Sequence, residues 1–306
     1  MGFDLKIPGW LLLTALIWGG AGGGLDAATG PDRSMRWFEK APDTAARGVA
    51  LVVHGLNLNP DRMVNLIRVL NTSGIGAMRL SLAGHGDNFQ PVPGLDPAEA
   101  RMETFKTVSY RMWSQDFLQA YRKARQLKHE LRVPLFLVAD SYGALLALAL
   151  TLSEPDVDFD RMILFAPAIS LKKRNFIVRL LSPFPRLVIP SFSPGFYRAN
   201  RGTPQAAYAV VFETLARFET SIGPKINIAT LVFIDPGDEL VSFDGLRQLV
   251  RKHRLDRWRI HRLTKDQENA ATKIHHLIID PASVGQSTWN RMVRAMLSHL
   301  LRPPAF

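Results

Sequence analysis

Ser141 lies between two apolar stretches of the sequence, residues 135–139 and residues 144–150. A serine between an apolar strand and an apolar helix is typical of a nucleophile elbow, the sharp turn that exposes a serine oxygen above a parallel sheet. That turn needs small residues two positions before and two positions after the serine, and Ala139 and Gly143 occupy these positions. The same pattern also fits an ordinary helix with Ser141 as its N-cap, so the motif alone leaves both interpretations open.

A second group of residues could activate such a serine. A serine hydroxyl becomes an effective nucleophile when a histidine accepts its proton and an acid orients that histidine. Asp238 follows the apolar run 230–234 in a Pro-Gly turn, and the pair His275-His276 comes later in the chain. This is the order serine, acid, histidine that accompanies an elbow. We expect Asp238 to be the acid, with Asp235 as a reserve, and either His275 or His276 to be the base.

The third requirement is a set of N–H donors for the oxyanion that forms when the serine attacks. Gly55 lies where the first core strand is expected to end, and Tyr142 directly follows the candidate nucleophile. The backbone N–H groups of Leu56 and Tyr142 are therefore the expected oxyanion donors. We interpret His54 as a structural residue whose side chain hydrogen-bonds to the glycine turn.

The scaffold that would position these groups is an α/β fold with a mostly parallel sheet. From about Arg36 onward, strand-like apolar runs alternate with helical patterns, which is typical of such folds. The expected strands are residues 48–53, 77–82, 135–139, 162–165, 230–234 and 259–263. The expected helices are residues 61–71, 109–130, 143–152, 243–253 and 287–301.

The alternation stops between residues 169 and 228. This segment holds a basic and apolar run at residues 171–181, a proline-rich stretch to Pro194, and a helical pattern around residues 206–218. A long insertion without a strand between two strands predicts a helical cap over the carboxyl edge of the sheet, where open α/β sheets bind ligands. A pair of helices without a function is the alternative.

Composition excludes several classes of function. The 306 residues are 47% hydrophobic and 21% charged, so the chain can bury a large core and is not globally disordered. The sequence has no cysteine, which excludes disulfides, thiol chemistry and zinc fingers, and no nucleic-acid-binding motif is present. The net charge of +11 is partly clustered at residues 172–174 and 251–262. Such clusters fit either solvated basic faces or attraction to an anionic membrane surface.

Residues 1–30 differ from the rest of the chain. Lys6 precedes an apolar run at residues 10–18 and a glycine-rich stretch at residues 19–24, and no further basic residue follows before Arg33. A short apolar region followed by small residues predicts a secretory signal peptide, and an uncleaved membrane anchor is the alternative. Either would make the protein exported (periplasmic or extracellular) or membrane-anchored, with its folded domain in residues 34–306.

Taken together, these motifs resemble the α/β-hydrolase superfamily, and within it the monoacylglycerol lipases and serine aminopeptidase-like hydrolases. The resemblance spans about residues 48–301, on His54-Gly55, Gly84-His85-Gly86-Asp87, Ala139-Asp140-Ser141-Tyr142-Gly143, Asp238 and His275-His276.

The resemblance implies Ser141 as nucleophile, Asp238 as acid, Leu56 and Tyr142 as oxyanion donors, and no metal or cofactor. Ala139 stands where the family usually has glycine. Family members often carry an acid five residues after the catalytic histidine. Asp280 has that relation to His275, which favours His275 slightly over His276.

The combined interpretation is a serine hydrolase that cleaves a carboxylic ester through an acyl-enzyme. The apolar and basic cap and the N-terminal segment suggest a hydrophobic or acyl-lipid ester and contact with a membrane surface. A peptidase, thioesterase or acyltransferase could use the same triad, because one fold hosts many chemistries. A catalytically silent, membrane-tethered binding module is the alternative from another class.

Overall fold

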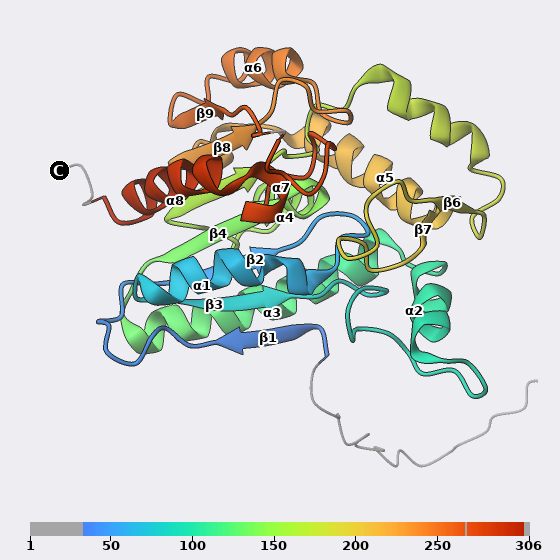
Figure 1. Cartoon of the computed structure of the whole chain (residues 1–306), viewed down its shortest axis with the longest axis horizontal. Coiled ribbons are helices and arrows are strands. Elements are labelled where there is room, and N and C mark those ends of the chain that lie inside the picture. The colour runs from blue at the N-terminus through green and yellow to red at the C-terminus, as the bar shows by residue number, and fades with distance from the viewer. Residues whose placement is uncertain (1–32, 267, 303–306) are drawn as a thin grey trace, which may run out of the picture. The chain divides into compact units, whose positions relative to one another are not determined.

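A mostly parallel sheet organises the protein (Figure 1). The computed structural model describes residues 33–266 and 268–302, and within them seven strands pair in the order β1-β3-β2-β4-β5-β8-β9. Only β1 in this sheet is antiparallel to its neighbour. The strands are β1 (Met35–Phe38), β2 (Gly48–Val53), β3 (Ile75–Leu80), β4 (Leu135–Asp140), β5 (Arg161–Phe165), β8 (Thr230–Ile234) and β9 (Trp258–Arg262).

Helices cover both faces of the sheet. Alternate residues of a strand face opposite sides, so the buried side chains form two apolar clusters, one on each face. One face packs against α1 (Val64–Thr72), α7 (Pro281–Val284) and α8 (Gln286–Leu300). The other packs against α3 (Tyr110–Leu131), α4 (Ser141–Ser153), α5 (Gln205–Ser221) and α6 (Phe243–Lys252). Residues 141–151 of α4 are all buried, which explains why this helix is apolar on every side.

The predicted strands and helices of the sheet are confirmed, most of them to within two residues. Around the main sheet, the edge strand β1 and the helices α2 (Pro97–Phe105) and α7 were not predicted. α2 begins with a capping box between Asp96 and Glu99, and it contributes the buried side chain of Phe105 to the core. A short 3₁₀ helix, η1 (Pro60–Met63), leads into α1.

The segment between β5 and β8 holds η2 (Lys173–Leu181), β6 (Val188–Pro190), β7 (Gly202–Pro204), α5 and η3 (Pro224–Ile226). The expectation of a segment without strands is wrong, because β6 and β7 pair as a small antiparallel sheet. The proline-rich chain here adopts an extended backbone, which proline permits at a sheet edge. α5 belongs to the core, because Val210, Leu215 and Phe218 pack in the same cluster as α4.

We use the term cap for residues 171–204, the part of this segment before α5. Its two ends lie on loops that follow strands of the main sheet. Asn175 bonds to the turn after β8, and Asn200 bonds to Asn57 in the turn after β2. The cap therefore lies against loops at the carboxyl edge of the sheet, whereas α5, which the predicted cap of residues 169–228 included, packs in the core.

The predicted signal peptide or anchor, residues 1–30, lies outside the described residues. Within the described part of the chain, no helix combines the length and the apolar character needed to cross a membrane.

Candidate active site

The turn from β4 to α4 presents Ser141 at the carboxyl edge of the sheet. Ser141 is the first residue of α4, and its φ of 46° lies in the left-handed region, which is strained for a serine. A Cβ on Gly143 would lie 2.4 Å from the carbonyl oxygen of His54, so only glycine fits there. Ala139 is fully buried in the core, which accommodates its methyl group. The N-cap of α4 is Asp140, so the turn is an elbow and not an ordinary helix start at a serine cap.

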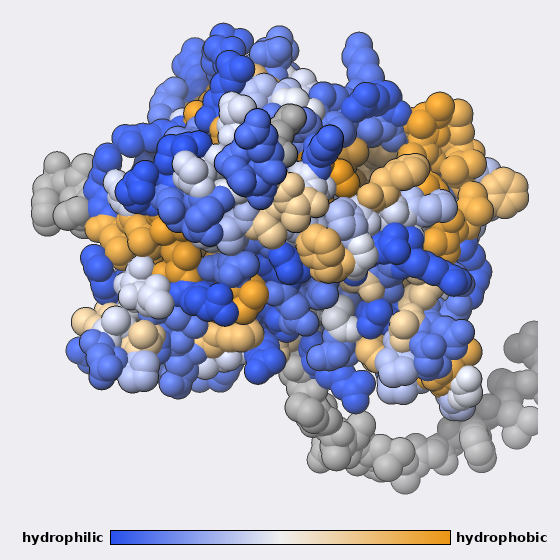
Figure 2. All heavy atoms as spheres, in the orientation of Figure 1, coloured by the Kyte–Doolittle hydropathy of each residue, from blue (hydrophilic) through white to orange (hydrophobic). Residues whose placement is uncertain are grey.

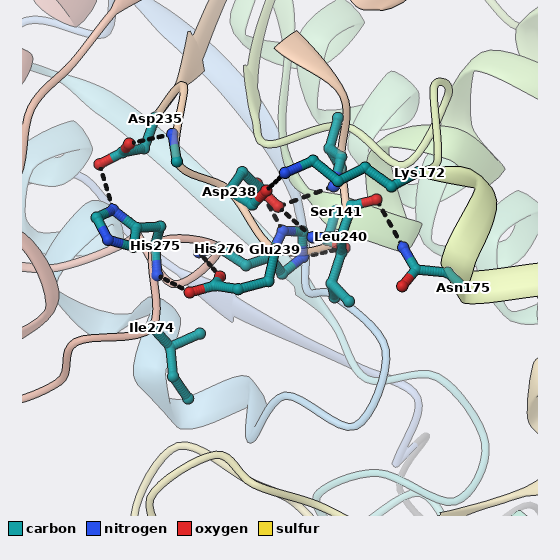
Figure 3. Close-up of polar contacts among 12 residues, drawn as sticks. Ser141, Lys172, Asn175, Asp235, Asp238, Glu239, Leu240, Ile274, His275 and His276 are labelled. Atoms are coloured by element: carbon teal, nitrogen blue, oxygen red, sulfur yellow. Dashed lines mark hydrogen bonds and ion pairs between the residues drawn. The ribbon is translucent and has the colours of Figure 1, made fainter.

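Ser141, His276 and Asp238 form a continuous chain of hydrogen bonds (Figure 3). Oγ of Ser141 lies 2.8 Å from Nε2 of His276, and Nδ1 of His276 lies 2.8 Å from Oδ2 of Asp238. The Asp238 side chain is fully buried, and the His276 side chain is 11% exposed. The three residues come from the loops that follow β4, β8 and β9. In this arrangement the histidine can take the serine proton while the acid holds the imidazole.

His275 is not part of this chain. Its Nδ1 lies 3.0 Å from Oδ2 of Asp235, the reserve acid, on the other side of the loop (Figure 3). Two adjacent histidines and two nearby acids therefore form separate pairs, and the slight preference for His275 over His276 is wrong. Asp280, on which that preference rested, instead caps α7 and accepts a hydrogen bond of 2.6 Å from the hydroxyl of Tyr197.

The Asp238 carboxylate is held by its own loop as well as by the histidine. Oδ1 accepts hydrogen bonds from the backbone N–H groups of Leu240 at 2.7 Å and Val241 at 2.8 Å. Burial alone would raise the pKa of Asp238, but the His276 imidazole and these two N–H groups hold that pKa below its ordinary value. The acid therefore stays ionised and keeps one oxygen directed at the histidine.

Carboxylates surround His276 and set its proton affinity. Burial alone would lower the pKa of His276, but the negative charges of Asp238, Asp140 and Glu239 outweigh that effect and raise the pKa. A raised pKa makes the imidazole a stronger proton acceptor, which favours removal of the serine proton.

The loop after β2 packs directly against the elbow. A Cβ on Gly55 would lie 2.4 Å from Oδ2 of Asp140 and 3.1 Å from Cβ of Ser141, so glycine alone allows this approach. Leu56 follows Gly55 and Tyr142 follows Ser141. The two backbone N–H groups expected to bind an oxyanion therefore come from two loops that touch.

Two buried histidines shape the loop after β2. Nδ1 of His54 donates to the carbonyl of Gly55 at 2.8 Å, and its Nε2 accepts from the N–H of Leu82 at 3.0 Å. Nε2 of His85 accepts from the N–H of Asn57 at 3.0 Å. Burial lowers the pKa of His54 to about 4 and lowers the pKa of His85 as well, so both rings are neutral and can accept these bonds. The structural interpretation of His54 is confirmed.

A family model described as serine aminopeptidase, S33, matches residues 44–209, which is more than half of the chain. The chain belongs to this family. It is a serine hydrolase on an α/β-hydrolase fold, as the motif resemblance predicted. The matched residues of this S33 family member include Ser141 and the loop after β2, and they end before Asp238 and His276. Among curated proteins, no relative matches the sequence.

Solved lipolytic enzymes have the same fold as this S33 family member. A soluble variant of the monoglyceride lipase from Saccharomyces cerevisiae, in complex with a substrate analog, is 14% identical with a TM-score of 0.68, covering 87% of this chain and 89% of that one. A metagenome-derived lipolytic enzyme is 16% identical with a TM-score of 0.65, covering 89% and 99%. A monoacylglycerol lipase from Paleococcus ferrophilus is 17% identical with a TM-score of 0.60, covering 87% and 98%.

The candidate site also contains residues that were not predicted from the sequence. Asn57 and Asn200 exchange two hydrogen bonds, of 3.0 and 2.9 Å, which join the loop after β2 to the cap. Nδ2 of Asn200 also donates to the carbonyl of Gly84 at 2.9 Å. This pair could not be recognised from the sequence, because the two asparagines are 143 positions apart and both lie in loops.

Basic and polar residues at the start of the cap hold the acid loop. The side chains of Lys172 and Asn175 donate to the carbonyls of Asp238 and Leu240 (Figure 3). The side chain of Arg174 donates to the carbonyl of Glu239. The basic run at residues 172–174, first interpreted as a solvated face or a membrane contact, thus also connects the cap to the loop that carries Asp238.

Asp140 is a buried acid beside Ser141 in this S33 family member. Its side chain lies against Gly55, next to Ser141, and burial raises its pKa to about 7. The charge on His276 lowers the pKa of Asp140, and the charge on Asp238 raises it. Asp140 and His276 therefore influence each other's ionisation near neutral pH.

Proposed function

We propose that the protein hydrolyses carboxylic esters with hydrophobic acyl groups through an acyl-enzyme intermediate. The observation that carries this proposal is the unbroken series of hydrogen bonds from Ser141 through His276 to Asp238. A catalytically silent module would have no need of a strained serine in contact with a buried histidine–acid pair.

In the proposed mechanism, His276 accepts the proton of Ser141 as Oγ attacks the ester carbonyl. The tetrahedral oxyanion is bound by the backbone N–H groups of Leu56 and Tyr142. His276 then gives the proton to the leaving alcohol, which leaves an acyl group on Ser141. A water molecule, deprotonated by the same histidine, hydrolyses that acyl-enzyme and returns the serine. Asp238 stabilises the imidazolium ion formed in each half-reaction.

The surface of the cap supports an acyl-lipid as the substrate. Six large apolar side chains of the cap are exposed, and Figure 2 shows apolar atoms gathered on the right of the molecule, where the cap lies. These side chains are Ile177, Leu180, Phe184, Leu187, Phe192 and Phe196. Soluble proteins seldom expose such a group, and it fits a surface that receives a lipid.

The charge of the cap supports an anionic membrane surface as the source of the lipid. The cap carries seven Lys and Arg residues and no Asp or Glu. Basic residues among exposed apolar side chains match the negative charge and the apolar interior of a membrane surface. The basic side chains include Lys173 and Arg179. The expected export or anchoring through residues 1–30 would place the protein near such a surface.

The relation of rate to acyl length tests the substrate class. We expect kcat/KM for p-nitrophenyl esters to rise from acetate to octanoate or longer chains, because the longer acyl group buries more apolar surface on the enzyme. A preference confined to acetate would contradict a lipid substrate. Cleavage of amino-acid amides in preference to esters would instead support the peptidase alternative.

A further inference from the structure

The loop that carries His276 is held by a carboxylate that belongs to no part of the triad. Glu239 directly follows Asp238, and its two oxygens accept from two successive backbone N–H groups (Figure 3). Oε1 lies 3.0 Å from the nitrogen of His275, and Oε2 lies 3.0 Å from the nitrogen of His276. One side chain therefore holds the main chain on both sides of the His275 Cα.

A buried lysine holds the same stretch of backbone from the opposite side. Lys265 is 4% exposed, and its Nζ donates to the carbonyl of Ile274. That carbonyl and the N–H of His275 belong to a single peptide group. The peptide group is thus bound by a positive charge at its oxygen and by a negative charge at its nitrogen.

Glu239 is itself well placed, because its own main chain is anchored. Arg174 of the cap donates to the carbonyl of Glu239 at 2.7 Å, and Asp238 is fixed by the N–H groups of Leu240 and Val241. Two consecutive residues of one turn therefore bind His276. Asp238 accepts from its ring, and Glu239 accepts from its backbone N–H group.

These contacts control where Nε2 of His276 can lie. The position of Nε2 depends on the backbone of His276 and on two side-chain torsions, and the bond from Nδ1 to Asp238 limits the torsions only if the backbone is fixed. Hydrogen bonds to a charged acceptor are shorter and stronger than neutral ones. Catalytic groups require support of this kind to stay within about 0.5 Å of the productive geometry.

We propose that Glu239 is a positioning residue for the hydrolase reaction, which fixes the backbone of the catalytic histidine, with Lys265 as its partner on the shared peptide group. This inference rests on the triad described under the proposed function. Glu239 accepts hydrogen bonds from the main chain of His275 and His276 and does not bond to Ser141, so its effect is on the placement and proton affinity of His276.

The test compares Glu239→Gln and Glu239→Asp with the wild type in the full-length protein. Gln keeps the size but replaces one acceptor oxygen by an NH₂ group that cannot accept from an N–H. Asp keeps the charge but is one methylene shorter, so it cannot reach both N–H groups. Glu219→Gln, at an exposed position on α5, is the matched control. The measurements are kcat and KM for p-nitrophenyl butyrate, the pH profile of kcat/KM, and the rate of labelling of Ser141 by a fluorophosphonate.

We expect Glu239→Gln to lower the plateau kcat on the order of 10- to 100-fold, as a small misplacement of a catalytic group does, with KM unchanged. On the acid side of its pH profile, the midpoint of kcat/KM should move to lower pH, because the charge of Glu239 raises the pKa of His276 in the wild type. Glu239→Asp should lower kcat with the acid limb in the wild-type position, which separates placement from charge. Glu219→Gln should behave as wild type.

A double-mutant cycle with Lys265→Met tests the shared peptide group. If Glu239 and Lys265 hold one unit, the loss of kcat in the double variant is smaller than the product of the two single losses.

The positioning role would be overturned if Glu239→Gln had the wild-type kcat at plateau pH, including the case in which the variant only melts at a lower temperature. The proposed function would then remain intact. A wild-type protein that neither reacts with the fluorophosphonate nor cleaves esters would overturn both.

Discussion

Nε2 of His276 lies 2.8 Å from Oγ of Ser141, although the two residues are 135 positions apart in the chain. The neighbouring His275 lies at Asp235 instead. Replacing each histidine by alanine therefore gives a matched pair. We expect His276→Ala to lower kcat for a soluble ester by about 10⁴-fold or more, because the serine loses its base. His275→Ala should stay within about tenfold of the wild type. Equal losses in the two variants would refute the assignment.

The acid limb of the pH profile reports the ionisation of His276. The reaction needs the neutral imidazole, and the surrounding carboxylates raise the pKa of His276 above its ordinary value of 6.5. We expect kcat/KM of the wild type to rise with pH to a midpoint above 6.5. Asp140→Asn removes one of the negative charges near the ring, so its midpoint should lie at lower pH. Asp244→Asn, at a side chain that is 81% exposed, is the control and should leave the midpoint in place.

The buried acid Asp140 also predicts a pH dependence of stability. Its pKa is raised from 3.8 to about 7 in the folded protein, so the unfolded chain releases this proton more readily than the folded chain. The wild type therefore loses stability as pH rises between about 4 and 7. Asp140→Asn should remove this loss, so its melting temperature relative to the wild type should rise by several degrees from pH 4 to pH 7, since about 1 kcal/mol corresponds to ~2–4 °C in a domain of this size. An identical difference at both pH values would contradict the raised pKa.

The two small residues of the elbow are not equivalent. A side chain at Gly143 meets the carbonyl oxygen of His54, a backbone atom that cannot move aside, whereas the methyl group of Ala139 is accommodated in the core. We expect Gly143→Ala to destabilise the protein by at least about 1–3 kcal/mol and to displace Ser141. Ala139→Gly restores the usual motif, and we expect it to cost only about 1 kcal/mol with activity retained. Urea denaturation and ester hydrolysis of both variants check this difference.

From the exposed apolar side chains of the cap, we predict an activity that depends on binding to a lipid surface. Phe192 is 94% exposed and Leu180 is 77% exposed. We expect the double variant Phe192→Asp/Leu180→Asp to bind more weakly to vesicles of phosphatidylcholine and phosphatidylglycerol, and to hydrolyse monoacylglycerol in those vesicles more slowly. Its rate of hydrolysis of a soluble short-chain ester should equal that of the wild type. Leu131→Asp is the control, because Leu131 is 45% exposed at the end of α3, which leads to the opposite edge of the sheet. Vesicle binding that is equal in all three proteins would contradict a membrane-facing cap.

Most of the fold could be predicted because its central strands are buried on both faces. β2, β4 and β8 are apolar runs with fully buried side chains, and such runs are visible in a sequence. β1 was missed because it is a short edge strand with an exposed Arg36, which has no apolar run to mark it. α2 did carry a signal in the sequence, because Asp96-Pro97 and Glu99 form a capping box at its start, although no helix was predicted there. β6 and β7 depend on each other across the cap, so neither is marked locally.

The candidate site was predictable down to the residue types and their order, but not to the choice between adjacent histidines. His275 and His276 differ by the direction in which the backbone presents each ring, and that direction depends on contacts with Glu239 and Lys265. The acid five residues beyond His275 was misleading, because Asp280 is used in a helix cap. The nucleophile was the more predictable member, since the elbow is a local structure with local size limits.

Activation of Ser141 as a nucleophile is the step on which the proposed function depends. Its most direct test is intact-mass spectrometry of the protein after incubation with a fluorophosphonate probe, followed by peptide mapping, for the wild type and Ser141→Ala. We predict that the wild type gains the mass of one phosphonyl group, mapped to Ser141, that His276→Ala gains it far more slowly, and that Ser141→Ala gains none. An unlabelled wild type, or equal labelling of Ser141→Ala, would contradict the role of Ser141 as the nucleophile.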